Sequence, residues 1–155
     1  MATRSAVEPR TDVAIGTSVR LRFAAPGAPW SGNQESSMHY RTRSARRALW
    51  LTALTARLME QRDAWAPVAG CRLEVRIGLP FARANASRDP SNYGGGAGTC
   101  KPIIDALTSA GAGIVPDDTP RWVRTTEPVL YLGTDVVVVL TVIGPGPLWD
   151  PTDPA

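Results

Sequence analysis

Apolar and polar positions alternate along several parts of the chain. Residues 19–23 alternate apolar side chains with arginines, and residues 71–79 repeat the pattern. A period of two is typical of a β-strand with one buried and one solvent-facing side. Residues 121–132 predict a third strand, bent near Pro128. The run VVVVLTVI within residues 135–143 predicts a fourth strand, central in the sheet.

A long helix is predicted between residues 42 and 64, where proline and glycine do not occur. Its apolar side chains divide between two faces. They are Ala45, Leu49, Ala53 and Ala56 on one face and Leu51, Leu54 and Leu58 on the other. Two arrangements fit this pattern: the helix packs against the sheet and against a second subunit, or it buries a single broad face.

A second, short helix is predicted at residues 101–110. Thr99 suits the N-cap position, Pro102 suits the first turn, and the glycines after residue 110 end the helix. Residues 26–43 are rich in Pro, Gly and Ser and predict a long loop.

The order strand, helix, strand, helix, strand, strand indicates an α+β fold, with a small mixed β-sheet of about four strands and two main helices. A chain of 155 residues fits one domain. We expect a disordered N-terminal tail at residues 1–17, one folded domain at residues 18–145, and a Pro-rich C-terminal tail at residues 146–155.

Composition narrows the class of protein. No apolar run approaches the roughly 18 to 20 residues needed to cross a bilayer, so we expect no membrane partner. The first residues, MATRSAVEPRTD, lack the apolar segment of a secretory signal, and we expect a cytoplasmic protein. Cys71 and Cys100 are expected to be buried thiols, because two cysteines and the single His39 are too few for a usual zinc site.

The charge is moderately basic, with a formal net charge of +3 and a pI near 9.3. A net positive charge of this size is compatible with an acidic polymer as partner, but many ordinary domains have a similar charge. Lys101 is the only lysine among the 17 basic residues. The bias towards arginine also fits a GC-rich coding sequence.

Residues 88–123 hold the most informative combination of side chains. Asp89 follows an apolar strand, Lys101 begins a helix, and Asp117 and Asp118 follow that helix. Mg²⁺ prefers carboxylate oxygens together with water and phosphate oxygens, so Asp89 and Asp118 are candidate ligands. A cation there would polarise a phosphodiester, and Lys101 would offset the negative charge that develops on it.

Each of these residues also has a structural interpretation. Asp117 is either a metal ligand or a turn-forming residue. Asp105 lies one helical turn beyond Lys101, and the two side chains could simply form a local ion pair worth about 0.2 to 0.5 kcal/mol. The GGGAG segment before Lys101 lacks the Gly-Lys-Ser/Thr of a phosphate-binding loop, so we expect no nucleotide cofactor. His39 either faces solvent or contacts a phosphate.

The series DPSN, then KPIIDALTSAGAGIVPDDTPRWV, resembles the RusA-type Holliday junction resolvases, whose pattern runs D-x-D-N, then K-x-x-x-D-A/G-L, then D-D. Residues 29–48, PWSGNQESSMHYRTRSARRA, are similar to the Pro, Asn and basic loop before that family's first helix. The resemblance covers residues 19–143. It implies a homodimeric, Mg²⁺-dependent endonuclease, with Mn²⁺ as an alternative metal, that resolves four-way DNA junctions by paired nicks.

The resemblance also implies roles for individual residues. Asp89, Lys101 and Asp118 would be catalytic, and Asp89, Asp117, Asp118 and Ser91 would contact the metal. Asn92 and Asp105 would position the substrate, and Asn33 belongs to the loop that resembles the family's. Arg41, Arg43, Arg46 and Arg47 cluster where that loop meets the long helix, with Arg88 near the motif, and guanidinium groups bind phosphates in bidentate fashion, so these arginines are candidate DNA contacts. For the arginines the alternative is a solvated helix face.

One position departs from the family pattern. Ser91 stands where the family has its second carboxylate, and a neutral hydroxyl holds Mg²⁺ less tightly. The segment between Asn92 and Lys101 is also longer than the pattern requires. The alternative prediction is therefore a DNA-junction binding protein with weak or lost cleavage.

Overall fold

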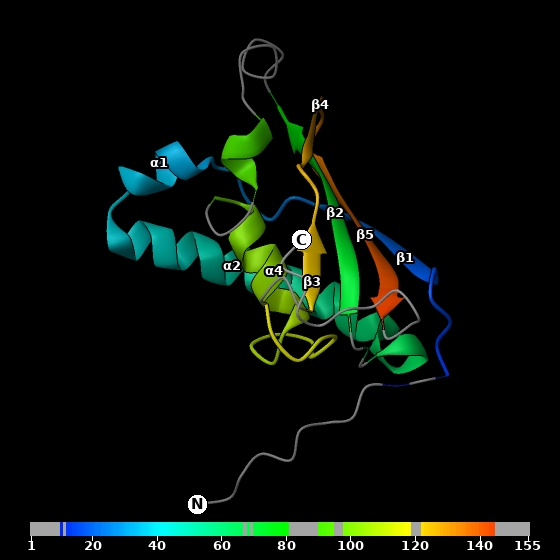
Figure 1. Cartoon of the computed structure of the whole chain (residues 1–155). Coiled ribbons are helices and arrows are strands. Elements are labelled where there is room, and N and C mark those ends of the chain that lie inside the picture. Colours follow the sequence, from blue (N-terminus) through cyan, green and yellow to red (C-terminus); the bar gives the residue numbers. More distant parts are fainter. Residues whose placement is uncertain are drawn as a thin grey trace, which may run out of the picture.

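The protein is described here from a computed structural model, which defines residues 10, 12–66, 68, 70–80, 90–94, 98–118 and 122–144, without the side chains of residues 64, 65 and 92. Over these residues the fold is α+β, with a five-stranded mixed sheet, three α-helices and one 3₁₀ turn (Figure 1). The α+β class is confirmed, and the sheet has one strand more than the sequence predicted.

The sheet is ordered β1-β5-β2, and β3 and β4 follow one another along the far edge of β2. These strands are β1 (Ser18–Ala24), β2 (Gly70–Leu79), β3 (Val123–Thr125), β4 (Val129–Leu132) and β5 (Asp135–Gly144). β5 is antiparallel to both neighbours, and its predicted central place is confirmed. The prediction of one bent strand at residues 121–132 is wrong. β3 and β4 are separate, and Pro128, which has no N–H to donate, stands between them.

The connection from β4 to β5 crosses the end of β2. β4 pairs with one edge of β2 and β5 with the other. Gly133 donates its N–H to the carbonyl of Leu79 at 3.1 Å. A Cβ on Gly78 would lie 2.7 Å from the carbonyl oxygen of Asp135, so only glycine fits beneath the crossing chain. The tight connection at residues 133–134 is therefore a crossover between two edges of β2 rather than a hairpin.

The long predicted helix is confirmed as α2 (Tyr40–Trp65). It packs on the sheet through Trp50, Leu54 and Leu58, all nearly fully buried, and Trp50 meets Phe23 of β1 edge-on at 6.3 Å. Leu49 on the opposite side is 49% exposed. α2 thus has one buried face in this chain and one face in contact with solvent.

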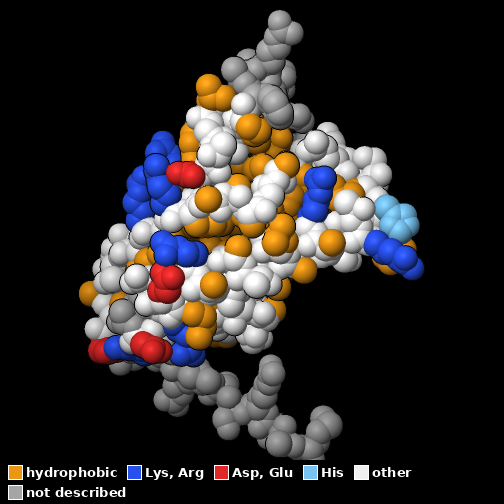
Figure 2. All heavy atoms as spheres, turned by 180° about the vertical axis from the view of Figure 1, so that it is seen from behind, with side chains coloured by type: hydrophobic (Ala, Val, Ile, Leu, Met, Phe, Trp, Pro, Cys, Tyr) orange, Lys and Arg blue, Asp and Glu red, His pale blue; other side chains and the backbone are white. Residues whose placement is uncertain are grey.

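The helices lie on one side of the sheet (Figure 1). Inward side chains of β2 and β5 form the core beneath them, as the alternating burial along both strands shows. Seen from behind, apolar side chains are dispersed over the middle of the surface and basic side chains gather towards its flanks (Figure 2). None of the helices in the described segments has the length and apolar character required to span a bilayer.

The predicted long loop at residues 26–43 is wrong in part. It contains α1 (Gly32–Ser36), and α2 already begins at Tyr40. Ser31 caps α1 through a capping box: its hydroxyl accepts from the N–H of Gln34, whose side chain accepts from the N–H of Ser31. His39 is the N-cap of α2, with an exposed ring stacked near Tyr40.

The second predicted helix is α4 (Cys100–Leu107), shorter at its C-terminus than expected. It ends because Leu107 accepts hydrogen bonds from the N–H groups of Ile114 and Val115 instead of continuing the helix. Between β2 and α4 lies the 3₁₀ turn η1 (Pro90–Tyr93), which contacts α1.

The chain before β1 is packed on the domain from residue 12 onward. Gly16 donates its N–H to Val142 of β5, and Val142 donates to Thr17. Arg10 bonds to Asp12 and to the carbonyl of Asp63. Residues 1–9 of the predicted N-terminal tail, and the C-terminal tail after residue 144, lie outside the described residues.

Candidate metal and phosphate site

The N-terminus of α4 is fixed to the segment that precedes α1. The backbone N–H and the hydroxyl of Thr99 both donate to the carbonyl of Trp30, at 3.0 and 2.9 Å, and Trp30 donates its N–H to the Thr99 hydroxyl at 2.8 Å. Both residues are fully buried. Thr99 occupies the predicted N-cap position but makes no side-chain cap bond to its own helix. Its hydroxyl holds two chain segments together instead.

Glycine is required directly before this contact. Gly98 has φ +65°, a left-handed conformation that other residues rarely adopt. A Cβ there would lie 3.0 Å from the carbonyl oxygen of Trp30. The close approach of the two segments therefore depends on the absence of a side chain at this position.

A buried carboxylate strengthens the same connection. Glu35 of α1 accepts a hydrogen bond from the Trp30 indole N–H at 2.7 Å and an ion pair from Arg47 of α2. Burial alone would raise the pKa of Glu35, but the bonds from Arg47 and Trp30, with a smaller one from the backbone of Gly98, outweigh it and leave the pKa below its ordinary value. Glu35 is thus ionised at neutral pH and joins α1, α2 and the start of α4.

Lys101 projects from the first turn of α4 between two carboxylates. Its Nζ lies 2.8 Å from Oδ1 of Asp105 and 3.4 Å from Oδ2 of Asp118. The bond to Asp105, aided by Asp118, raises the pKa of Lys101 above its ordinary value. The ammonium is therefore charged at neutral pH, although it stands near the positive end of its helix, where an anion is favoured.

The three side chains are partly accessible, with exposed fractions of 26% for Lys101, 31% for Asp105 and 39% for Asp118. A polymer could reach them without any rearrangement of the core. The Lys101 ammonium lies farther from Asp118 than from Asp105, so the ion pair with Asp118 is the weaker of the two. Asp117 accepts a bond from the backbone N–H of Asp118 at 2.8 Å, which is the turn-forming role that the sequence left open.

The carboxylate oxygens beside Lys101 are of the chemical type that binds a hard cation. Carboxylate oxygens are the ligands that Mg²⁺ prefers, and Asp118 presents one beside a cationic group that suits a phosphate oxygen. Within the described part of the chain, no group of three or more His, Cys, Asp or Glu side chains is arranged to hold a metal ion. Asp118 fits one ligand position, and Asp89, the other predicted carboxylate ligand, lies outside the described residues.

The remaining predicted residues of this region are placed as follows. Arg88 lies outside the described residues, as Asp89 does, and the side chain of Asn92 is not described. Ser91 is exposed in η1, immediately after Pro90. Asn33 is exposed in α1, where its carbonyl accepts a bond from the Ser36 hydroxyl.

The predicted basic cluster at the start of α2 divides into different environments. Arg41 is exposed and lies against the Tyr40 ring, with Nε 3.1 Å from the Tyr40 hydroxyl. Arg43 and Arg46 are half-buried. Arg47 forms an ion pair with the buried Glu35, a structural contact that the local sequence pattern did not predict.

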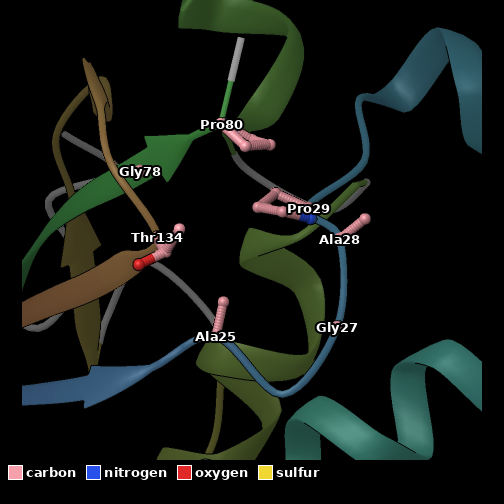
Figure 3. Close-up of a pocket in the computed structure, with 7 residues that line it drawn as sticks. All are labelled: Ala25, Gly27, Ala28, Pro29, Gly78, Pro80 and Thr134. Carbon is pink, nitrogen blue, oxygen red and sulfur yellow. The ribbon is translucent and has the colours of Figure 1, made fainter.

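Two further features lie apart from the site. A small cavity of about 210 Å³ is bounded by uncharged residues where β2 ends (Figure 3). These are Ala25, Gly27, Ala28, Pro29, Gly78, Pro80 and Thr134.

Cys71 and Cys100 are buried free thiols, as predicted, and burial raises the pKa of each to about 12. Neither cysteine is a reactive thiolate at neutral pH.

No protein-family model matches this chain, and no curated protein matches it either.

Proposed function

We propose that the protein is a Mg²⁺-dependent endodeoxyribonuclease that acts on branched DNA by paired nicks, in the manner of the RusA-type Holliday junction resolvases that its sequence resembles. The observation that carries this proposal is the ammonium of Lys101 held between Asp105 and Asp118 at the partly exposed start of α4. A cytoplasmic location and a homodimer belong to the same proposal.

The roles of the side chains follow from their charges. Asp118, together with Asp89, would hold the metal, which would polarise the phosphodiester and favour ionisation of a water. Lys101, protonated at neutral pH, donates to a non-bridging phosphate oxygen and offsets the charge that grows there. Asp105 keeps the ammonium directed at the site through its 2.8 Å contact.

Thr99 and Glu35 are positioning residues in this scheme. Both act on the segment immediately before Lys101, Thr99 through Trp30 and Glu35 through Trp30 and Arg47. A fixed N-terminus of α4 limits the error in the placement of Lys101, and small misplacements of a charged group reduce catalysis strongly. The buried network thus serves the proposed chemistry without touching substrate.

A second candidate is a DNA-junction binding protein that cleaves poorly. It is favoured by Ser91, a neutral side chain exposed in η1 where the family pattern has a carboxylate. With one negative charge fewer, the site would hold Mg²⁺ less tightly. The pair Asp105 and Asp117 would have to compensate, and each already has a partner within the chain.

The two candidates are separated by incubating the purified protein with a labelled four-way junction and Mg²⁺ or Mn²⁺. Paired nicks in opposing strands support the nuclease, whereas a gel shift without nicks supports the binding protein. Asp118→Asn is expected to abolish nicking and retain binding. Asp63→Asn, which removes a 97% exposed carboxylate on α2, is the matched control and should nick like the wild type. If neither nicks nor shifts occur at low salt, both candidates are wrong.

For the homodimer, support comes from the solvent-facing side of α2. Leu49 and Met59 are 49% and 53% exposed there, on the helix face that also carries the exposed Ala45 and Ala56. Two copies joined by a two-fold axis would present two sites to equivalent strands of a junction. Sedimentation velocity of Leu49→Glu tests this surface: the proposal expects monomers from the variant and dimers from the wild type, and an unchanged dimer contradicts it.

A further inference from the structure

The side of the sheet that faces away from the helices carries an excess of basic side chains. Outward positions follow from the strand register and the alternating burial. They include Arg20 and Arg22 of β1, Arg72 and Arg76 of β2, and Arg124 of β3. The carboxylates on the same strand positions are Glu74 and Asp135. Five positive and two negative charges give this arginine face a formal net charge of +3.

The arginines are arranged in rows across the sheet. Arg72 lies directly opposite Arg124 on the parallel neighbour β3. Arg22 and Arg76 flank Val137 of β5 in another row. The sheet thus places several cations close together, and Arg22 is also paired with Asp135 of β5 at 3.5 Å.

Val137 shows how these side chains lie. It points outward, on the side that no helix covers, and yet it is only 1% exposed. Its cross-strand neighbours are Arg22 and Arg76, whose long aliphatic stems can cover a valine while the guanidinium groups remain in water. Arginine stems that lie against the sheet lose less conformational entropy when the guanidinium groups bind a ligand.

We infer that the arginine face is a second nucleic-acid surface, which binds the phosphate backbone of a DNA segment separate from the one at Lys101. Guanidinium groups bind phosphate oxygens in bidentate fashion. Same-side residues on one strand are about 7 Å apart and neighbouring strands about 4.8 Å apart, so the face offers several cations within the length of a few nucleotides.

The net positive charge of the arginine face indicates which kind of ligand binds it. A second copy of this face would bring +3 against +3, so the face does not pair with itself. Because α4 lies on the opposite side of the sheet, a single straight duplex segment at Lys101 does not also lie on the arginine face (Figure 1). A branched substrate supplies more than one duplex segment. The identity of the polyanion as DNA rests on the proposed function, and the charge argument stands independently of it.

The test measures binding of a short labelled duplex without divalent metal, as a function of salt, for the full chain. Arg20→Gln with Arg72→Gln removes two exposed cations of the arginine face. The slope of log affinity against log salt should fall by about 1.8, so that the deficit relative to wild type shrinks roughly tenfold between about 50 and 200 mM salt. The matched control, Arg20→Lys with Arg72→Lys, keeps both charges and should keep the slope.

Glu74→Gln raises the net positive charge of the arginine face instead of lowering it, because it removes a half-buried carboxylate between Arg72 and Arg76. It should tighten duplex binding. An unchanged salt slope in the double Gln variant, with a normal melting temperature, overturns the inference. So does binding of polyglutamate, but not of DNA, at this face. A wild type that fails to nick junctions while the slope falls as expected would contradict the nuclease proposal and leave the arginine face intact.

Discussion

Truncation of Glu35 is the sharpest test of the buried network that precedes Lys101. Glu35→Ala leaves the indole N–H of Trp30, which is fully buried, without the acceptor that lies 2.7 Å away. An unsatisfied buried donor costs about 1 to 3 kcal/mol. Arg47 loses its ion-pair partner as well, but its side chain is 34% exposed and can be hydrated. The loss of this ion pair therefore lowers the free energy of unfolding by about 1 kcal/mol or less. We expect a total near 3 kcal/mol.

The assay is equilibrium unfolding in urea, with thermal melting as a second probe. A loss of that size lowers the melting temperature of a domain of this length by roughly 6 to 12 °C. Glu35→Gln keeps an acceptor for Trp30 and loses only the charge, so it should cost about 1 to 2 kcal/mol. Glu60→Ala, which removes an exposed partner of Arg57 on α2, is the control and should cost less than about 0.5 kcal/mol.

The pH dependence of the same variants gives an independent check. Because the folded pKa of Glu35 is depressed, its contribution is present above the ordinary carboxyl pKa of about 4.3 and is lost as pH falls through the lower folded value. The difference in stability between the wild type and Glu35→Gln should therefore shrink below about pH 4. A Glu35→Ala variant within about 0.5 kcal/mol of the wild type at neutral pH would refute the role assigned to this network.

Three more outcomes are expected. Gly78→Ala should lower the free energy of unfolding in urea by about 2 kcal/mol or more. Gly27→Ala is the control, because its Cβ would meet the nearest atom at 3.5 Å, and it should cost below about 1 kcal/mol. Equal costs for the two variants would contradict the crossover packing. Both cysteines should resist alkylation at pH 8 until the chain unfolds, and rapid labelling of native protein would contradict their burial. Asp105→Asn should lower the pKa of Lys101, read from the single lysine signal in NMR; an unchanged pKa would contradict the ion pair.

Much of the fold was predictable because strands and the long helix carry regular apolar patterns. The alternation in residues 71–79 and the run of valines in β5 each specify a buried face, and the structure follows both. β3 and β4 were merged because their apolar residues read as one stretch. The separation depends on pairing with two different parts of β2, a long-range contact that local pattern does not record.

Parts of the site were less accessible to sequence reasoning. The proximity of Lys101 to Asp105 follows from helical spacing, but its contact with Asp118 depends on the path of the chain after α4. Glu35 was missed because it lies in a polar segment that looked like a loop. The signal that was available is the Ser31 to Gln34 capping box, which marks a helix start and so places Glu35 on a helix.

The proposed nuclease activity requires that Asp89 and Asp118 lie close together beside Lys101. Crystals soaked in Mn²⁺, with data collected to show the anomalous signal of the metal, test it directly. We expect one strong peak bonded to carboxylate oxygens of Asp89 and Asp118, with the Lys101 ammonium beside it. Well-ordered Asp89 and Asp118 side chains on separate surfaces, with no peak between them, would contradict it.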